Sequence, residues 1–262
     1  MNWNSLVLDK QNGKGWITLN RPHYNALNLE LANELIQALE NCCEDENVKV
    51  VILTGAGEGF CSGGDLEAAR ESEDPDPSDY WKHLTRRLNR IIVDIRYLRK
   101  PIIAAINGPA AGAGLSIAAA CDLRIAARSA VFKQAWTSVG LVPDGAWTLF
   151  IPILIGFGRA SEMVFMDPVL TAEKALEIGL VNAVVDDDKF NEEVDRWAEK
   201  LKNGATEAFA RAKELLNESM LSLLEAQLSR ERREIITTAL TGDYREGMHA
   251  FLEKREPRFK GL

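Results

Sequence analysis

The stretch that most constrains the fold is residues 100–122, which read KPIIAAINGPAAGAGLSIAAACD. It starts with a wholly apolar run at 102–106, which predicts a strand buried on both faces. A loop with three glycines follows, and residues 115–120 are apolar and alanine-rich, which predicts a buried helix. Glycines let another molecule approach the backbone closely, and the first N–H groups of a helix lack partners within it. Such a turn can bind a negatively charged oxygen.

A second strand is expected to end in a similar loop. The apolar run at 50–54 leads into GAGEGFCSGGDL, residues 55–66. Either loop alone also fits an ordinary connection packed with small residues. Two such loops together could supply the two backbone N–H donors that an oxyanion hole needs.

Length and charge bound the class of protein. The chain of 262 residues fits one large domain, or one domain with a helical appendage. Its net charge of −8 argues against nucleic acid or an anionic membrane as the main partner. The apolar runs are too short to span a membrane, and the N-terminus has no signal pattern. The four cysteines lack metal-ligand spacing and are expected to be reduced, so we expect a cytoplasmic protein without a metal.

The N-terminal two thirds of the chain predict short strands alternating with helices. Asn12-Gly13 between strands at 6–9 and 16–20 predicts a hairpin, and Asn28 can cap the helix that follows. The acidic, proline-containing segment 67–79 is interpreted as a mobile surface loop, and residues 80–98 as a helix with one apolar face. A further strand is expected at 123–126.

The last third of the chain is expected to be helical. Thr171 can cap a short helix, and periodic segments follow at 189–201, 206–216, 220–240 and 244–254. The apolar positions of segment 220–240 exceed what one small domain needs to bury, which predicts a trimer or hexamer. We therefore divide the chain into an α/β core, residues 1–200, and a C-terminal helical oligomerisation region, residues 201–262.

Several common nucleotide and catalytic motifs are absent. GAGEGF spaces its glycines as G-x-G-x-G, which differs from the dinucleotide-binding spacing G-x-G-x-x-G. No acidic residue ends a second strand at the distance that such a site requires, so we reject this interpretation. The chain also lacks GxxxxGK[ST], GxSxG and HExxH.

Six motifs occur in the order typical of one superfamily: LNRPHYNAL, ILTGAGEGFCSGGDL, KPIIAAINGPAAGAGLSIAAACDLRIA, VGLVPDGAW, TAEKALEIGLVNAVV and FLEKREPRFKG. Together they resemble the crotonase (enoyl-CoA hydratase/isomerase) superfamily over nearly the whole chain. The resemblance implies a spiral of β–β–α units with a C-terminal helical trimerisation region. It also implies an acyl-coenzyme A thioester as substrate, a homotrimer or hexamer, and no metal or redox cofactor.

By position, the resemblance implies that the oxyanion donors are the backbone N–H groups of Gly64 and Ala113. The family often has three consecutive glycines in the second loop, where this chain has alanine in the middle. The N–H survives that change, but the methyl group must fit. Each fixed donor in a dry site contributes roughly 2.7–4 kcal/mol of transition-state stabilisation.

The proton-transfer group is the next part of the site on which the resemblance bears. Hydratases of the family use two glutamates, at positions where this chain has Ser116 and Trp136. Family isomerases often carry one carboxylate in a P-[DE]-G turn, which Asp144 matches. Pro-Asp-Gly is also an ordinary turn sequence. Apolar neighbours are expected to raise the pKa of Asp144 and to let it carry a proton.

Trp136 allows a second interpretation. A tryptophan eight residues before the aspartate resembles the aryl-CoA dehalogenase branch, whose aspartate is a nucleophile assisted by a histidine. The position of that histidine is Asn89 here, which argues against this chemistry. Trp136 could also simply fill the core, and Ser116 is assigned with it to the substrate pocket.

The phosphates of coenzyme A require cations. Arg21 and the C-terminal Lys254, Arg258 and Lys260 are candidates, although the C-terminal cations would also fit a solvated tail. The resemblance implies that the adenine contacts residues around Ser62, Asp65 and Leu66, and Phe259 of a neighbouring subunit.

The sequence thus favours an enoyl-CoA isomerase that shifts a C=C bond by proton transfer. An enoyl-CoA hydratase, or an acyl-CoA dehalogenase or hydrolase using Asp144, is the alternative among enzymes. A non-catalytic acyl-CoA-binding or scaffold protein of the same fold is the alternative outside enzymes. A few members of the superfamily also bind RNA, which the net charge of −8 argues against here.

Overall fold

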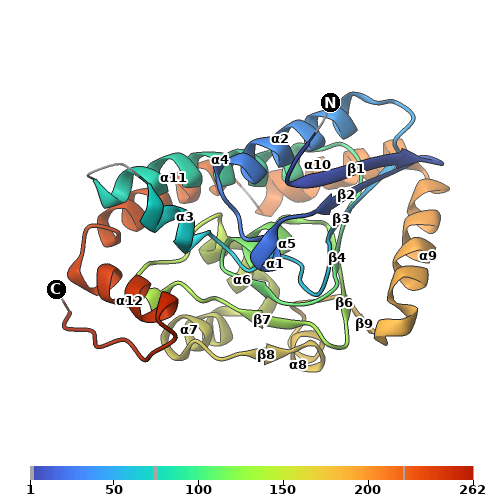
Figure 1. Cartoon of the computed structure of the whole chain (residues 1–262). Helices are drawn as coiled ribbons and strands as arrows, with labels where there is room; N and C mark the ends of the chain where they lie inside the picture. The colour runs from blue at the N-terminus through green and yellow to red at the C-terminus, as the bar shows by residue number, and fades with distance from the viewer. Residues whose placement is uncertain (1–2, 73–75, 221, 262) are drawn as a thin grey trace.

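The apolar run at 102–106 forms the central strand β4 (Ile102–Ile106), and all of its residues are buried, as predicted. Figure 1 shows the computed structural model, which describes residues 3–72, 76–220 and 222–261. β4 lies inside a six-stranded sheet with the order β1-β2-β3-β4-β6-β9. The other strands are β1 (Leu6–Gln11), β2 (Lys14–Leu19), β3 (Val50–Gly55), β6 (Leu123–Ala127) and β9 (Ala183–Val185).

The predicted hairpin is confirmed. β1 and β2 pair antiparallel, and Asn12 and Gly13 between them both have positive φ. That geometry suits Asn-Gly and joins strands in two residues. All other pairs in the sheet are parallel, which places the ends of β3 and β4 at the same edge.

Alternate residues of β4 point into two apolar cores. Ile103 and Ala105 face α9 (Phe190–Lys202), which covers one side of the sheet. Ile102, Ala104 and Ile106 belong to the larger core on the other side. Helices α2 (Leu29–Glu44), α4 (Pro77–Tyr97) and α5 (Ala113–Ala120) build that side (Figure 1).

Two helix caps were predicted correctly. The Asn28 side chain accepts a hydrogen bond from the Leu31 N–H at the start of α2. The Thr171 hydroxyl accepts from the Lys174 N–H at the start of α8 (Ala172–Glu177). Both side chains satisfy a donor that the first helical turn leaves unpaired.

A second, three-stranded sheet has the order β5-β7-β8. Its strands are β5 (Ala110–Ala111), β7 (Val131–Lys133) and β8 (Leu170–Thr171). β5 lies within the glycine loop that follows β4. The second sheet therefore fixes that loop from its far side.

The prediction of a mobile loop at 67–79 is wrong for residues 67–71. These form α3 (Leu66–Glu71), because the Asp65 carboxylate accepts from the Ala68 N–H and caps the helix. α4 begins at Pro77, three residues before the predicted start, and Pro suits the first turn of a helix. Residues 73–75 lie outside the described part of the chain.

Two helices were not predicted. α6 (Trp147–Ile155) and α7 (Phe157–Met166) occupy a segment for which the sequence analysis expected no helix. Pro152 lies inside α6, where a proline normally argues against a helix. The short helical pieces that complete the chain are α1 (Pro22–Asn25), η1 (Thr137–Val139) and η2 (Asp187–Lys189).

The C-terminal region is helical, as predicted, but the segment 220–240 is not one helix. α10 (Thr206–Met220) ends where that helix was expected to begin, and α11 runs from Leu224 to Thr238. Residue 221 lies outside the described part of the chain. α12 (Gly242–Leu252) follows and packs on η1, where Gly247 approaches the Val139 backbone.

The apolar stripe of α11 is covered by this chain itself. Leu224, Leu228 and Ile235 lie in the larger core, and α11 packs against α4 and α6. The sequence argument for a trimer or hexamer counted these positions together with Leu223, which is 62% exposed. The trimer or hexamer stays a prediction. The division of the chain at residue 200 stays a prediction.

Candidate active site

The glycine loops after β3 and β4 bind each other through the backbone. The Ala111 N–H donates to the Cys61 oxygen at 2.9 Å, and the Cys61 N–H donates to the Pro109 oxygen at 3.1 Å. A Cβ on Gly114 would lie 2.2 Å from the Cys61 oxygen. Because no side chain tolerates such a contact, glycine is required for the two loops to meet.

The Gly64 N–H points away from the strand-like contact that holds its neighbours. The Gly63 oxygen accepts from the Leu27 N–H at 2.7 Å, and the Asp65 N–H donates to the Leu27 oxygen at 3.0 Å. Successive N–H groups of an extended chain point to opposite sides. Within the described residues, the Gly64 N–H has no hydrogen-bond acceptor.

The Ala113 N–H is the first of α5. Leu115 and Ser116 donate to the Gly112 oxygen, whereas Ala113 has no acceptor among the described residues. Gly112 has φ of 49° and lies in contact with Gly63, so the two loops bring their open N–H groups to one region. The Ala113 side chain is buried, so its methyl group fits in the core.

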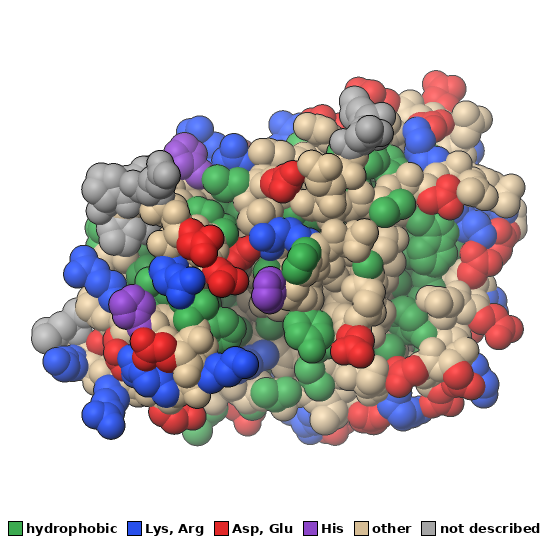
Figure 2. Space-filling model, in the orientation of Figure 1, with side chains coloured by type: hydrophobic (Ala, Val, Ile, Leu, Met, Phe, Trp, Pro, Cys, Tyr) green, Lys and Arg blue, Asp and Glu red, His purple; other side chains and the backbone are tan. Residues whose placement is uncertain are grey.

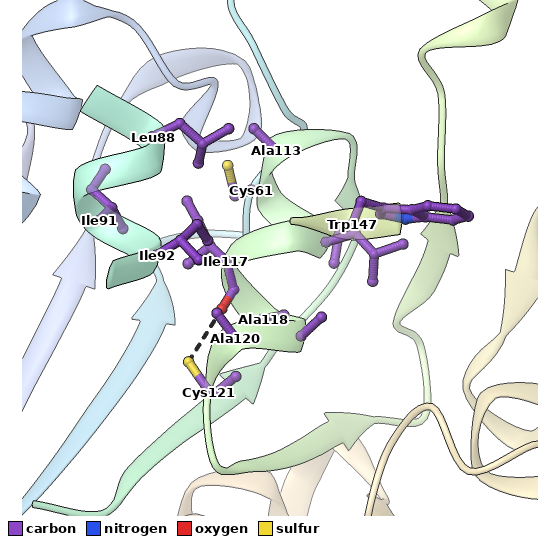
Figure 3. Close-up of a cluster of buried hydrophobic side chains, with 14 of the residues drawn as sticks. Cys61, Leu88, Ile91, Ile92, Ala113, Ile117, Ala118, Ala120, Cys121 and Trp147 are labelled. Atoms are coloured by element: carbon purple, nitrogen blue, oxygen red, sulfur yellow. Dashed lines mark hydrogen bonds between the residues drawn. The ribbon is translucent and has the colours of Figure 1, made fainter. Parts of the chain in front are cut away.

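The surroundings of these donors are apolar. A Cβ on Gly64 would meet the Trp81 ring and Leu84 of α4. Figure 3 shows Leu88 of α4 and Cys61 beside Ala113, with Ile117 and Trp147 nearby. Such walls exclude water, which strengthens hydrogen bonds to a developing negative charge.

Asp144 is 3% exposed and lies at a turn before α6. The Ser116 hydroxyl of α5 donates to the Asp144 backbone oxygen at 2.7 Å. Gly145 has φ of 68°, and a Cβ there would lie 2.9 Å from both Leu88 and Ser116. Ser116, predicted as a pocket residue, thus joins the turn of Asp144 to the helix that starts at Ala113.

Three effects act on the pKa of Asp144. Burial raises the pKa of its carboxyl well above the ordinary range, and the Glu231 carboxylate raises it further. A hydrogen bond from the side chain of Trp136 lowers it in part. Trp136 also meets Trp147 edge to face, with ring centroids 6.3 Å apart. Trp136 therefore both fills the core and contacts the candidate catalytic carboxyl.

Glu231 of α11 was not singled out from the sequence. Its carboxylate is buried and accepts from the N–H groups of Ala146 and Thr148 and from the Thr148 hydroxyl. A signal was present, because Glu231 occupies a core position of the helical series Leu224, Leu228, Glu231, Ile235. A charged residue in an apolar stripe marks a special role.

Asn89 does not resemble a general base. Its side-chain amide donates to the Leu228 backbone oxygen at 3.2 Å, which joins α4 to α11. An amide in any case cannot take up a proton near neutral pH.

The predicted adenine-binding residues lie together around α3. Arg21 pairs with Asp65 at 2.7 Å and donates to the Ala26 oxygen at 2.8 Å. The Ser62 hydroxyl donates to the His23 oxygen, and Leu66 begins α3. The Asp65 carboxylate therefore already pairs with the charge of Arg21, and a role of Arg21 at a phosphate stays a prediction.

The C-terminal candidates lie apart from these residues in the sequence, on and beyond α12. A groove of about 920 Å³ is lined by three cations and three acids: Arg255, Arg258, Lys260, Asp243, Glu246 and Glu256. Figure 2 shows the same mixture of charges over α12 and the tail. Phe259 is 43% exposed, and among the described residues the ammonium groups of Lys254 and Lys260 have no ion pair.

No metal site is visible among the described residues, where no three His, Cys, Asp or Glu side chains could share an ion. All four cysteines are free. No helix in the described ranges is both long and apolar enough to cross a membrane.

Comparisons with known proteins match this chain to one family. The model of the family described as enoyl-CoA hydratase/isomerase matches residues 9–262. The 1,2-epoxyphenylacetyl-CoA isomerase of Escherichia coli is 36% identical over 246 residues, 94% of each chain. The trans-2-decenoyl-[acyl-carrier-protein] isomerase of Streptococcus mutans is 31% identical over the full length of both. A crystal structure of an enoyl-CoA hydratase from Mycobacterium avium subsp. paratuberculosis superposes with a TM-score of 0.90, at 34% identity over 99% of this chain and 100% of that one.

Proposed function

The chain belongs to the enoyl-CoA hydratase/isomerase family, and from that premise we propose that it is an enoyl-CoA isomerase that moves a C=C bond by proton transfer. The observation that carries this proposal is the buried Asp144 carboxyl, whose turn is joined by Ser116 to the helix that starts at Ala113, together with two open backbone N–H groups. Ser116 and Trp136 occupy the positions of the two hydratase glutamates, which disfavours the addition of water.

The proposed reaction balances with one proton. The Asp144 carboxylate removes a proton from the carbon next to the thioester carbonyl, and the C–H electrons pass into the conjugated enolate. The N–H groups of Gly64 and Ala113 donate to the enolate oxygen, where the negative charge develops. The Asp144 carboxylic acid then returns the proton at the far end of the conjugated system, which completes the shift and restores the carboxylate.

The environment of Asp144 suits this role. A group that first takes and then gives a proton works best with a pKa near the working pH. Burial supplies that adjustment here, because it disfavours the charged form of the carboxyl. A dry, apolar pocket would also keep water away from the enolate.

Binding of coenzyme A is the part of the proposal with the fewest fixed contacts. We assign its adenine to the segment Ser62, Asp65 and Leu66, and its phosphates to Lys254 and Lys260 with Arg21 at the edge. A trimer or hexamer would bring Phe259 of one copy to the site of the next. The exposed apolar side chains of α7, Phe157, Phe165 and Met166, support such an assembly, and sedimentation of a stable monomer at micromolar concentration would contradict it.

The decisive experiment is Asp144→Asn. It keeps the shape of the turn but removes the proton acceptor. Turnover and exchange of substrate α- and γ-hydrogens with deuterated water should fall by about 10²–10⁴-fold, while acyl-CoA binding stays within a few-fold. A loss under threefold would sink the isomerase assignment.

A nucleophilic Asp144 is the second candidate, because the hydrogen bond from Trp136 favours its ionised form. It would leave ¹⁸O from solvent in the Asp144 carboxyl after a single turnover, and the isomerase would not. A protein that only binds acyl-CoA would show neither hydrogen exchange with deuterated water nor ¹⁸O in the Asp144 carboxyl. A protein that binds RNA would show an affinity for RNA that falls steeply as the salt concentration rises.

A further inference from the structure

Glu231 holds the segment that directly follows Asp144. Its carboxylate accepts from the Ala146 N–H at 2.6 Å and from the Thr148 N–H at 3.0 Å. The Thr148 hydroxyl donates to the same carboxylate and accepts from the Gln227 amide at 2.7 Å. Glu231 is 4% exposed, so it pays a large desolvation cost to make these bonds.

The backbone that Glu231 holds is strained. Ala146 has φ of 60°, a left-handed conformation that costs a non-glycine residue free energy and persists only when its surroundings impose it. Ser116 fixes the Asp144 oxygen from α5, and Glu231 fixes the Ala146 N–H from α11. Asp144 therefore lies between two clamps that come from different parts of the chain.

The charge of Glu231 also reaches Asp144. After burial, the negative charge of Glu231 is the next largest cause of the raised pKa of the Asp144 carboxyl. The other elements packed around the turn present neutral groups there: Ser116 from α5, Leu88 from α4, Thr148 from α6 and Trp136 before η1. Burial raises the pKa of Glu231 to about 7, although its three hydrogen bonds favour the charged form.

We propose that Glu231 is a positioning residue for Asp144, which holds the turn through Ala146 and Thr148 and whose negative charge makes Asp144 a stronger base. This inference rests on the proposed role of Asp144 as the group that carries the proton. Glu231 itself does not touch the substrate. It acts through the backbone after Asp144 and through its electric field.

The test is Glu231→Gln, read by titration as well as by rate. We expect the pKa of Asp144, followed by ¹³C NMR of its labelled carboxyl in the free enzyme, to fall by about 0.5–1 unit when the negative charge is removed. We also expect kcat to fall about tenfold with KM within threefold, and the acidic limb of the kcat profile to move to lower pH. An unchanged Asp144 titration would overturn the proposal.

The titration distinguishes this inference from the proposed function. A shift of the Asp144 pKa in a protein whose Asp144→Asn variant keeps its activity would refute the isomerase mechanism and leave the electrostatic coupling intact. The matched control is Glu34→Gln. Glu34 is also a buried carboxylate that accepts two backbone N–H groups, from Asn4 and Ser5, but it lies on α2. It should leave both the Asp144 titration and the rate profile unchanged.

Glu231→Asp separates position from charge, and it keeps the proposal testable where the Gln variant does not fold. It retains the negative charge but is shorter by one methylene. We expect kcat to fall while the acidic limb stays within about 0.3 unit of the parent. Full activity in Glu231→Asp would contradict the positioning role.

Discussion

The side of the site proposed to hold the thioester oxygen is made of backbone, whereas the side proposed to move the proton is made of buried side chains. Gly64 and Ala113 contribute N–H groups whose directions follow from two glycine loops locked together. Asp144, Trp136 and Glu231 contribute groups whose properties depend on burial and on one another. A backbone donor is lost only when the chain path or the amide itself changes, while a side-chain carboxyl can be retuned by any neighbour.

Apart from the loss expected for Asp144→Asn, the largest effect is expected on the backbone side. Gly64→Pro removes the N–H and should lower turnover by about 10²–10³-fold, equivalent to about 2.7–4 kcal/mol. Steady-state kinetics on a variant shown to be folded by circular dichroism would measure it.

Gly64→Ala is the matched control for the proline. Both variants add a Cβ, which would lie 2.9 Å from the Trp81 ring, but only the proline lacks the N–H. The alanine variant should therefore retain clearly more activity. Equal activities would show that the added Cβ, and not the lost donor, causes the defect.

The elements that depend on residues close together in the sequence could be predicted. The strand at 102–106, the Asn12-Gly13 hairpin and the Asn28 cap depend on residues close to each other in the chain. The two glycine loops could also be predicted, because each directly follows an apolar run that is recognisable as a strand. The resemblance to the crotonase superfamily then indicated Gly64, Ala113 and Asp144.

What was missed depends on contacts between distant residues. The start of α6 is held by Glu231 from α11, and no local pattern shows that contact. The end of α10 at Met220 interrupts a segment whose periodicity reads as continuous. Glu231 could have been found from its place in the apolar stripe, but its acceptor role required knowing that Ala146 and Thr148 lie opposite.

A moderate effect is expected on the side-chain half. Trp136→Phe keeps the ring and removes the indole N–H, which lowers the pKa of Asp144 in the parent. The pKa of Asp144 should therefore rise, so the acidic limb of the rate profile moves to higher pH, opposite to Glu231→Gln. We expect turnover at neutral pH to fall about tenfold. If the acidic limb of the Trp136→Phe profile moved to lower pH instead, the opposite effects assigned to Trp136 and Glu231 would be contradicted.

The smallest effect concerns stability. The folded pKa of Asp144 lies above its unfolded value, so between these values the folded chain binds more protons and loses stability as pH rises. Asp144→Asn removes that loss and should stabilise the free protein by about 0.5–2 kcal/mol at pH 8. The gain should shrink toward pH 4, and urea unfolding at both values measures it.

Asp45→Asn is the control for the sign. A hydrogen bond from Lys10 holds the pKa of the half-buried Asp45 below its ordinary range. The folded chain therefore gains stability above the unfolded pKa of Asp45, and its replacement should destabilise the protein at pH 8. If both variants changed the free energy of unfolding at pH 8 in the same direction, the assignment of Asp144 as a carboxyl whose pKa is raised by burial would be contradicted.

The bond between Glu231 and Ala146 spans 85 positions of the chain, whereas the bond between Ser116 and Asp144 spans 28. At roughly 5–20 residues per second, a ribosome needs about 4–17 s to go from Ala146 to Glu231, and about 1–6 s from Ser116 to Asp144. During that interval the growing chain holds both glycine loops and the Asp144 turn, but the N–H groups of Ala146 and Thr148 still lack their acceptor. The site is therefore completed late in synthesis. A chain truncated before α11 would contain both glycine loops and the Asp144 turn but would lack the carboxylate that accepts from Ala146 and Thr148.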